Sequence, residues 1–271
     1  MRVAFQGEPG AYSEQAVFNY FGTVETMPCE SFDVVFDSVV SGECEQGLIP
    51  IENSLAGSIH QNYDLLLRHD LHIVGEYLLR VRHCLIALPG VDREDIKKAI
   101  SHPQALGQCA AYLRNLGIKP ETVYDTAGSV KLLKASGERT TAAIASRRAA
   151  ELYGMEIIEE GIEDNPENYT RFLAIRKQAI QPEGESKTSI VFTLKNQPGS
   201  LFKAMSVFAL RDIDLTKIES RPLQGKPWEY LFYVDFIGAT HQETVRKALD
   251  HLGEYALMLR VLGSYPRYMG G

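Results

Sequence analysis

The sequence predicts a mixed α/β protein in two parts, a large N-terminal region of two lobes and a small C-terminal domain of the order βαββαβ. With 271 residues, the chain is too long for one small core. Short apolar runs alternate with helix-period segments through the first part, which is typical of layered α/β folds. A polar stretch rich in Pro and Gly, residues 181–186, separates two strand-like segments. We therefore place the domain boundary there.

The elements of the first part are clearest near its start. Residues 45–51 and 71–74 are expected to be strands, and residues 58–67 a helix between them. An earlier helix has Ser31 as its expected N-cap. Its apolar stripe has the spacing i, i+3, i+4, i+7 and consists of Phe32, Val35, Phe36 and Val39.

An extended segment, residues 77–88, divides the first part into its two lobes and carries Arg80, Arg82 and His83. A new series of strand and helix signals follows it. We expect a ligand cleft between the lobes. Their expected limits are about 1–77 with 169–180 for one lobe and about 80–168 for the other.

The C-terminal part reads as strand, helix, strand, strand, helix, strand, the split pattern of ferredoxin-like domains. The first strand holds Ile190, Phe192 and Leu194, the second covers about 213–220 and the last about 257–262. The third strand is expected to present Trp228, Tyr230, Phe232, Val234 and Phe236 on one face. The expected helical stripes are Leu201, Met205, Phe208 and Ala209, then Val245, Ala248, Leu249 and Leu252.

Composition and missing motifs exclude several classes of function. A net charge of −7 without a dense Lys/Arg run argues against nucleic-acid binding, and no apolar stretch approaches membrane-spanning length, which argues against a membrane partner. There is no phosphate-binding P-loop, dinucleotide turn or serine-hydrolase elbow, and no His pair with metal-ligand spacing. The start of the chain shows no leader, and the four Cys residues are scattered. The sequence thus predicts a cytoplasmic protein with reduced thiols and a small-molecule partner.

Four strand-to-helix junctions could contribute a binding site. Each is a short loop with Ser, Thr, Asn or Gly before a helix, where free backbone N–H groups can bind an anion. Several such junctions in one cleft would hold a small dicarboxylate. The alternative for each is an ordinary helix cap. The junctions are residues 7–13, 52–58, 101–104 and 125–129.

Five ordered segments give the chain a resemblance to the prephenate dehydratases. They are Pro-Ile-Glu-Asn-Ser (50–54), Gly-Ser-Ile (57–59), Ser-His-Pro-Gln (101–104), Asp-Thr-Ala-Gly-Ser (125–129) and Asn-Tyr-Thr-Arg-Phe (168–172). The C-terminal part is similar to the ACT domain that follows this catalytic unit, with Glu-Ser-Arg-Pro at 219–222. The resemblance implies a catalytic region at 1–180, similar in architecture to type II periplasmic binding proteins, and a ferredoxin-like ACT domain at 187–265.

The resemblance implies that the enzyme converts prephenate to phenylpyruvate, water and CO2 in phenylalanine biosynthesis. The matching catalytic positions are Asn53, Ser101, Gln108 and Thr170. The expected substrate-binding positions are Arg171, a candidate partner of a substrate carboxylate, with Ser54, Thr126, Ala127, Gly128 and Ser129. Each has a structural alternative, such as a cap, a turn or an ion pair. His102 is treated as a cap or packing residue, and Tyr169 and Phe172 as the cleft floor. No cofactor and no metal is required.

In this family the ACT domain binds L-phenylalanine, the end product, as an allosteric effector between paired copies, which implies a homodimer or homotetramer. The expected effector positions are Gly199, Ser200, Leu201, Phe202, Glu219, Ser220, Arg221 and Pro222. Ser200 and Phe202 depart from the common Gly-Ala-Leu-Val form, which leaves the effector and its affinity open. Two rival functions also stay open, an arogenate dehydratase and a sensor that binds a small anion without turnover.

Overall fold

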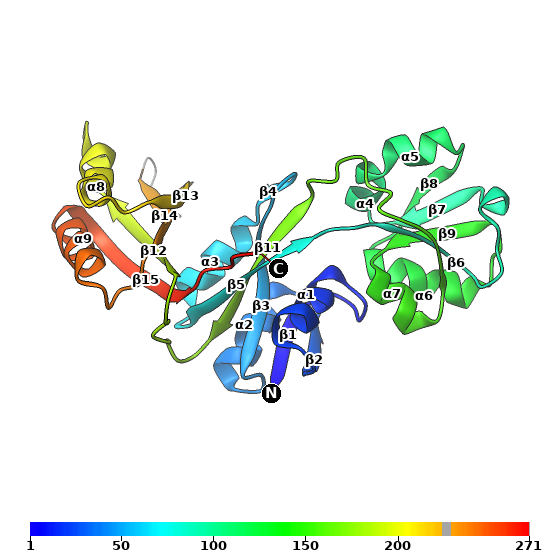
Figure 1. Cartoon of the computed structure of the whole chain (residues 1–271), viewed down its shortest axis with the longest axis horizontal. Coiled ribbons are helices and arrows are strands. Elements are labelled where there is room, and N and C mark those ends of the chain that lie inside the picture. The colour runs from blue at the N-terminus through cyan, green and yellow to red at the C-terminus, as the bar shows by residue number, and fades with distance from the viewer. Residues whose placement is uncertain (224–228, 271) are drawn as a thin grey trace. The chain divides into compact units, whose positions relative to one another are not determined.

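The computed structural model describes residues 1–223 and 229–270, and its elements are labelled in Figure 1. The predicted mixed α/β class is confirmed. Two compact units are present, one of Met1–Leu65 with Tyr77–Phe172 and one of Leu66–Glu76 with Leu173–Gly271. Trp228, predicted to lie in a strand, is outside the described residues. Among the described helices, none combines the length and the apolarity needed to cross a membrane.

The first lobe is built on a sheet of order β2-β1-β3-β11-β5, with β4 paired to β3. Strand β1 is parallel to both β2 and β3, so helices must connect them. The strands β5 and β11 each continue from one unit into the other. The elements are β1 (Arg2–Gln6), α1 (Tyr12–Phe21), β2 (Glu25–Cys29), α2 (Phe32–Ser41), β3 (Gln46–Asn53), β4 (Gly57–Ser58), α3 (His60–Arg68), β5 (His72–Arg80) and β11 (Tyr169–Arg176).

Helix α2 forms as its sequence predicts. The Ser31 hydroxyl accepts a hydrogen bond from the Val34 N–H and so caps the helix. Val35, Phe36 and Val39 are buried, so the predicted stripe does face the core.

The second lobe has a sheet of order β10-β6-β9-β7-β8 with helices on both faces. Leu85 and Ala87 of β6 pack with α4 and α5, whereas Cys84 and Ile86 pack with α6 and α7. This double burial explains the continuous apolar run of β9. The elements are β6 (Cys84–Ala87), η1 (Arg93–Asp95), β7 (Lys98–Ser101), α4 (Pro103–Gln108), α5 (Ala110–Asn115), β8 (Lys119–Thr122), α6 (Thr126–Ser136), β9 (Thr141–Ala145), α7 (Arg147–Tyr153) and β10 (Glu156–Glu160).

The C-terminal domain has the predicted βαββαβ order and an antiparallel sheet of order β13-β14-β12-β15. Its core joins the sheet to both helices through Phe192, Phe236, Phe208 and Leu252. Val245 and Ala248 of the second predicted helical stripe are also buried. The elements are β12 (Ser186–Leu194), α8 (Ser200–Ala209), β13 (Leu215–Pro222), β14 (Tyr230–Ile237), α9 (Glu243–Tyr255) and β15 (Ala256–Pro266).

The stripe predicted for the first helix of this domain is only partly correct. Helix α8 buries Ala204, Val207 and Phe208, while Leu201 and Ala209 are exposed. Residues 204, 207 and 208 also share one face of a helix. The buried face of α8 is therefore rotated about the helix axis relative to the predicted face. Leu201 and Phe202 are therefore surface side chains of the first turn, and Phe202 is 77% exposed.

Candidate active site

Within the first unit, residues of both lobes line a cavity of about 280 Å³. This volume is close to the lower end of the range for small-molecule sites. Among the described residues, the lining includes no Asp, Glu, Lys or Arg. It consists of Tyr12, Ser13, Pro50, Asn53, Ala56, Gly57, Ser58, Ile59, Val81, His83, His102, Gln104, Ala105, Gln108, Thr126, Asn168, Thr170 and Phe172. The site is therefore polar but almost without charge.

Asn53 ends β3 and has a fixed amide orientation. Its Oδ1 accepts hydrogen bonds from the backbone N–H groups of Leu55 and Ala56, at 3.0 and 2.9 Å. Because backbone N–H groups only donate, the other side of the amide must be the NH2 group. This group donates to Asn168 Oδ1 at 2.8 Å and to Thr170 Oγ1 at 3.0 Å.

The hydroxyl of Thr170 consequently accepts a hydrogen bond from Asn53 and keeps its own proton to donate. Thr170 lines the cavity, so a bound ligand can receive that proton as a hydrogen bond. Asn53 and Thr170, both predicted catalytic residues, are thus in direct contact in the structure.

Gln108, the third predicted catalytic residue in the cavity, lies at the end of α4. Its Oε1 accepts from Asn168 Nδ2 at 3.1 Å and from His83 Nε2 at 2.8 Å. The His83 Nδ1 is 2.8 Å from the Tyr12 hydroxyl. Burial lowers the pKa of His83 below its ordinary value of 6.5, although Gln108 and Glu163 oppose that shift. Burial of His83 therefore favours the neutral imidazole.

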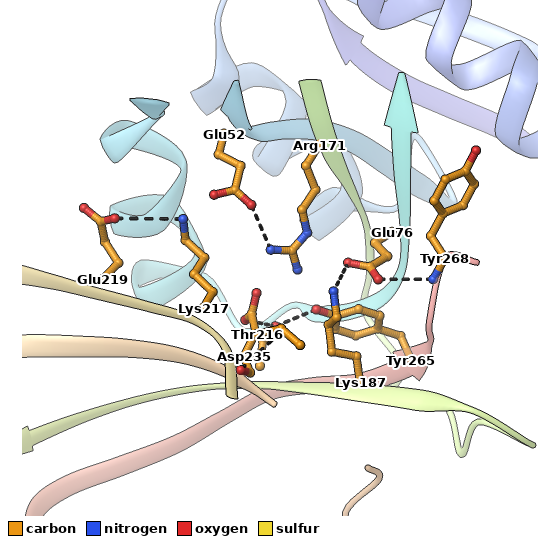
Figure 2. Close-up of polar contacts among 11 residues, drawn as sticks. Glu52, Glu76, Arg171, Lys187, Thr216, Lys217, Glu219, Asp235, Tyr265 and Tyr268 are labelled. Atoms are coloured by element: carbon orange, nitrogen blue, oxygen red, sulfur yellow. Dashed lines mark hydrogen bonds and ion pairs between the residues drawn. The ribbon is translucent and has the colours of Figure 1, made fainter. Parts of the chain in front are cut away.

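The prediction that Arg171 reaches the substrate is not supported, because neighbouring side chains in a strand point to opposite faces. Thr170 and Phe172 of β11 line the cavity, and Arg171 between them is absent from its lining. The Arg171 Nη1 lies 3.1 Å from Glu52 Oε1 in an ion pair, which Figure 2 shows. Its side chain is only 8% exposed.

Ser101, the fourth predicted catalytic residue, is also absent from the cavity lining. It ends β7, is fully buried, and donates its hydroxyl to the Ile144 carbonyl of β9 at 2.6 Å. The helix that follows is capped by His102, whose Nδ1 accepts from the Gln104 N–H. Ser101 therefore ties two neighbouring strands together below the site.

The four predicted anion-binding junctions are largely satisfied by the chain itself. Glu14 accepts from Gly10 N, Asn53 from Leu55 N and Ala56 N, His102 from Gln104 N and Asp125 from Gly128 N. At 101–104 and 125–129 this is the ordinary helix cap that was the alternative, whereas at 7–13 and 52–58 the acceptor holds the loop ahead of the helix.

The junction at 125–129 brings only one predicted binding residue to the cavity, Thr126. Ala127 and Ser129 are buried, and Ser129 donates to the Thr126 carbonyl. Gly128 donates its N–H to Asp125, so that donor is occupied. Ser54 is likewise outside the lining, and its hydroxyl bridges the Glu167 carbonyl and the Tyr169 N–H. Tyr169, expected at the cleft floor, is absent from the lining, whereas Phe172 belongs to it.

Seven polar residues that line the cavity were not among the predicted site residues: Tyr12, Ser13, Ser58, His83, His102, Gln104 and Asn168. Asn168 lies inside a signature segment and His83 in the extended crossover, which were the available signals. Tyr12 carried no signal beyond its place in a polar junction.

In the C-terminal domain, Ser200 and Leu201 line a second, smaller cavity of about 110 Å³ together with Tyr230 and Phe232. Gly199 precedes α8 with φ +83°, a conformation that suits glycine. Phe202 lies in the same helical turn, outside this lining. Glu219, Ser220, Arg221 and Pro222 belong to the edge strand β13 and are also outside it.

Comparison with known proteins gives two family matches along the chain. The model described as prephenate dehydratase matches residues 3–180, and the ACT domain model matches residues 188–254. Arogenate dehydratase/prephenate dehydratase 2, chloroplastic, from Arabidopsis thaliana is 51% identical over 98% of this chain and 73% of its own length. The corresponding protein 1 is 48% identical over 98% of this chain and 72% of its own length.

Solved structures of similar fold include a prephenate dehydratase from Arthrobacter aurescens in complex with L-Phe. It has a TM-score of 0.90 and 30% identity, and the match covers 98% of this chain and 90% of that one. A quorum quenching acylase, GqqA, has a TM-score of 0.93 and 34% identity over 99% of both chains.

The predicted cytoplasmic location is contradicted by these comparisons. Both plant relatives are named chloroplastic. We therefore withdraw the cytoplasmic assignment.

Proposed function

This chain belongs to the prephenate dehydratase family, and we propose that its cavity binds prephenate and catalyses the loss of CO2 and the ring hydroxyl. The enzyme is a lyase, and its product from prephenate is phenylpyruvate, the precursor of phenylalanine. The reaction turns a cyclohexadiene into an aromatic ring, so much of the driving force comes from the substrate. One proton is needed to release the hydroxyl as water.

The nearly uncharged lining of the cavity suits this reaction. The carboxylate that leaves as CO2 loses its negative charge during the reaction. A cation paired with that carboxylate would stabilise the substrate more than the transition state and slow the step. Neutral hydrogen-bond donors such as Gln108 and Thr170 can orient the substrate without that penalty, while Asn53 holds Thr170 in place.

The observation that carries the proposal is the direction of the Thr170 hydroxyl. Asn53 donates to Thr170 Oγ1, so the Thr170 proton is available for the departing hydroxyl in the cavity. A Thr hydroxyl is a weak acid, so it acts as a positioned donor to the leaving oxygen and keeps its own proton, while solvent water supplies the proton that completes the departing water. A donor aimed at developing charge can contribute about 3 to 4 kcal/mol to the transition state. We assign Asn53 and Gln108 to orienting Thr170 and the substrate, and no cofactor.

Amide hydrolysis is the rival suggested by the similarity to the acylase. Such a reaction uses a nucleophile with a base in hydrogen-bond reach. In the described part of the chain, the two cavity histidines bond to Tyr12, Gln108 and the Gln104 backbone, and neither bonds to a Ser or Thr hydroxyl. This arrangement favours the dehydratase.

The test is to incubate the purified protein with prephenate, arogenate and an N-acyl amide in parallel. Phenylpyruvate from prephenate supports the proposal, and phenylalanine from arogenate identifies the amino analogue as a further substrate. Hydrolysis of the N-acyl amide alone would transfer the assignment to the acylase class. Tight binding of prephenate without turnover by the fully folded protein would make it a sensor.

We also infer that the domain at 187–265, separate from a catalytic region at 1–180, binds L-phenylalanine as a feedback effector. The support is the Phe-bound relative and the cavity beside Ser200 and Leu201. At about 110 Å³ this cavity is smaller than ordinary ligand sites. The exposed Leu201 and Phe202 could complete it against a second copy, which supports a homodimer or homotetramer.

A further inference from the structure

The Gln108 side-chain oxygen accepts two hydrogen bonds from the protein. A residue that only contacted the substrate would not need these two bonds. Oε1 accepts from Asn168 on one side and from His83 on the other. Asn168 is in turn held by Asn53, whose own amide is fixed by backbone N–H groups. The Gln108 amide is therefore the middle of a chain of hydrogen bonds that is anchored at the Asn53 end.

The direction of every hydrogen bond in this chain follows from the fixed end. Asn53 donates to Asn168 Oδ1, so Asn168 presents its NH2 group to Gln108, and the Gln108 atom that receives it is the oxygen. An amide oxygen has no proton, so His83 Nε2 must carry one. The Gln108 NH2 group is then the side of the amide left for a cavity ligand.

The second anchor of the chain is Tyr12. Its hydroxyl lies 2.8 Å from His83 Nδ1 and 3.0 Å from the Arg82 carbonyl, and its ring meets the His83 ring edge-on. With a proton on Nε2, the neutral imidazole has an acceptor at Nδ1, and the single Tyr12 hydroxyl proton then goes to this nitrogen at 2.8 Å instead of to the Arg82 carbonyl at 3.0 Å. His83 is only 2% exposed, so the ring has little room to turn.

Tyr12 is itself held in place by the loop before α1. The Gly10 N–H donates to Glu14, and the Gly10 carbonyl accepts from the Ser146 hydroxyl at 2.6 Å. This loop therefore fixes the start of the helix that carries Tyr12.

We propose that His83, held by Tyr12, is a positioning residue that fixes the Gln108 amide with its NH2 group toward the substrate. This inference rests on the proposed function and deepens it, because it assigns Gln108 the role of a donor. His83 does not touch the substrate through either ring nitrogen, since both are occupied by Gln108 and Tyr12.

The first test separates positioning from folding. His83→Leu should lower kcat about 10- to 100-fold with a smaller change in KM, because a donor displaced by about 1 Å can cost that much. His83→Gln places an amide NH2 group near the position of Nε2 and should recover part of kcat. Tyr12→Phe keeps the ring and removes only the hydroxyl, so its loss should be smaller than that of His83→Leu. The exposed His241→Leu is the matched control and should behave as wild type.

The second test asks whether His83 acts through Gln108. In a Gln108→Ala background, adding His83→Leu should change kcat by no more than about two-fold, since the group that His83 positions is gone. Two losses that multiply, or a His83→Leu enzyme with wild-type kcat, would overturn the proposal. A wild-type enzyme that turns over none of the three substrates would instead reject the proposed function.

A spectroscopic readout is independent of turnover. In protein with 15N-labelled histidine, the His83 signals are identified by their loss in His83→Gln. We expect a protonated Nε2 and an unprotonated Nδ1, and a shift of the Nδ1 signal in Tyr12→Phe. A proton on Nδ1 alone would contradict the assignment, whatever the kinetics show.

Discussion

Thr170 keeps its hydroxyl proton for a ligand, because its Oγ1 already accepts a hydrogen bond from Asn53. Thr170→Ser keeps the oxygen and should keep part of kcat, while Thr170→Val keeps the shape and should lose about 10²- to 10³-fold, as for removal of one transition-state donor. Steady-state kinetics with prephenate checks this. A Val variant with wild-type turnover would remove Thr170 from the mechanism.

His83 also makes stability depend on pH. Burial lowers the pKa of His83 in the folded state below its ordinary value of 6.5, with Gln108 and Glu163 acting in the opposite direction. Between the folded and the ordinary pKa, the unfolded chain binds more protons, so the free energy of unfolding should fall as pH drops below about 6.5. Urea unfolding between about pH 7.5 and pH 5.5 measures the slope, and His83→Gln should flatten it. An unchanged slope would mean that another group causes it.

The site residues that the sequence could identify are those in signature segments whose side chains also happen to face the cavity. Asn53 and Thr170 meet both conditions, whereas Gln108 faces the cavity but lies four positions beyond the Ser-His-Pro-Gln segment. Arg171 and Ser101 meet only the first condition. A motif does not specify which face of a strand a side chain occupies, or whether a hydroxyl is buried in the core, because both depend on packing. Tyr12 joins the site through a contact 71 positions away in the chain, which local patterns cannot predict.

The loop before α1 depends on glycine at position 10. Gly10 has φ +92°, and an added Cβ would lie 2.9 Å from Ala149 Cα. Gly10→Ala should therefore cost about 2 kcal/mol or more in unfolding free energy and reduce kcat by displacing Tyr12. Gly117→Ala is the matched control, because Gly117 has φ +67° but open space around it. Equal losses in both variants would show that backbone strain alone matters.

In the second unit, β5 and β12 are linked by a buried ion pair, which Figure 2 shows. Lys187 Nζ lies 2.9 Å from Glu76 Oε2, with the side chains 11% and 1% exposed. Glu76→Gln would leave the Lys187 ammonium without its carboxylate, at a cost of about 3 to 5 kcal/mol. Adding Lys187→Met should recover much of this loss in chemical denaturation. A double variant no more stable than Glu76→Gln would show that the Glu76 carboxylate itself is needed there.

Whole elements were easier to predict than their faces. Helix α2 has both its cap and its stripe where the sequence indicates, because the stripe is strictly periodic. In α8 nearly every position is apolar or small, so the pattern could not say which residues face the sheet. The sequence pattern therefore did not show that Leu201 and Phe202 are exposed. Both lie where the effector is proposed to bind.

At the scale of the molecule, the division into units does not follow the chain order. Residues Leu66–Glu76 belong with the C-terminal unit, although they precede most of the cavity residues in sequence. Composition can indicate a linker between two domains. It cannot predict which segments far apart in the sequence pack together. As a result β5 leads from Glu76 toward Val81 and His83, and β11 leads from Thr170 into the second unit. In both strands the chain therefore passes from one unit into the other.

The proposed feedback can be tested at the exposed side chain of Phe202. If L-phenylalanine binds where two copies meet, it should lower turnover of prephenate, with a coupling of about 1 to 3 kcal/mol between the two sites. Phe202→Ser removes a ring that is 77% exposed, so it should weaken self-association. It should also weaken inhibition, measured as the ratio of the inhibited to the uninhibited rate of the same variant. Leu210→Ser, 78% exposed just beyond the other end of α8, is the matched control and should leave both unchanged. Sedimentation equilibrium with and without phenylalanine gives the association state. A wild-type protein that stays monomeric in both conditions, yet is inhibited, would place the effector within a single copy.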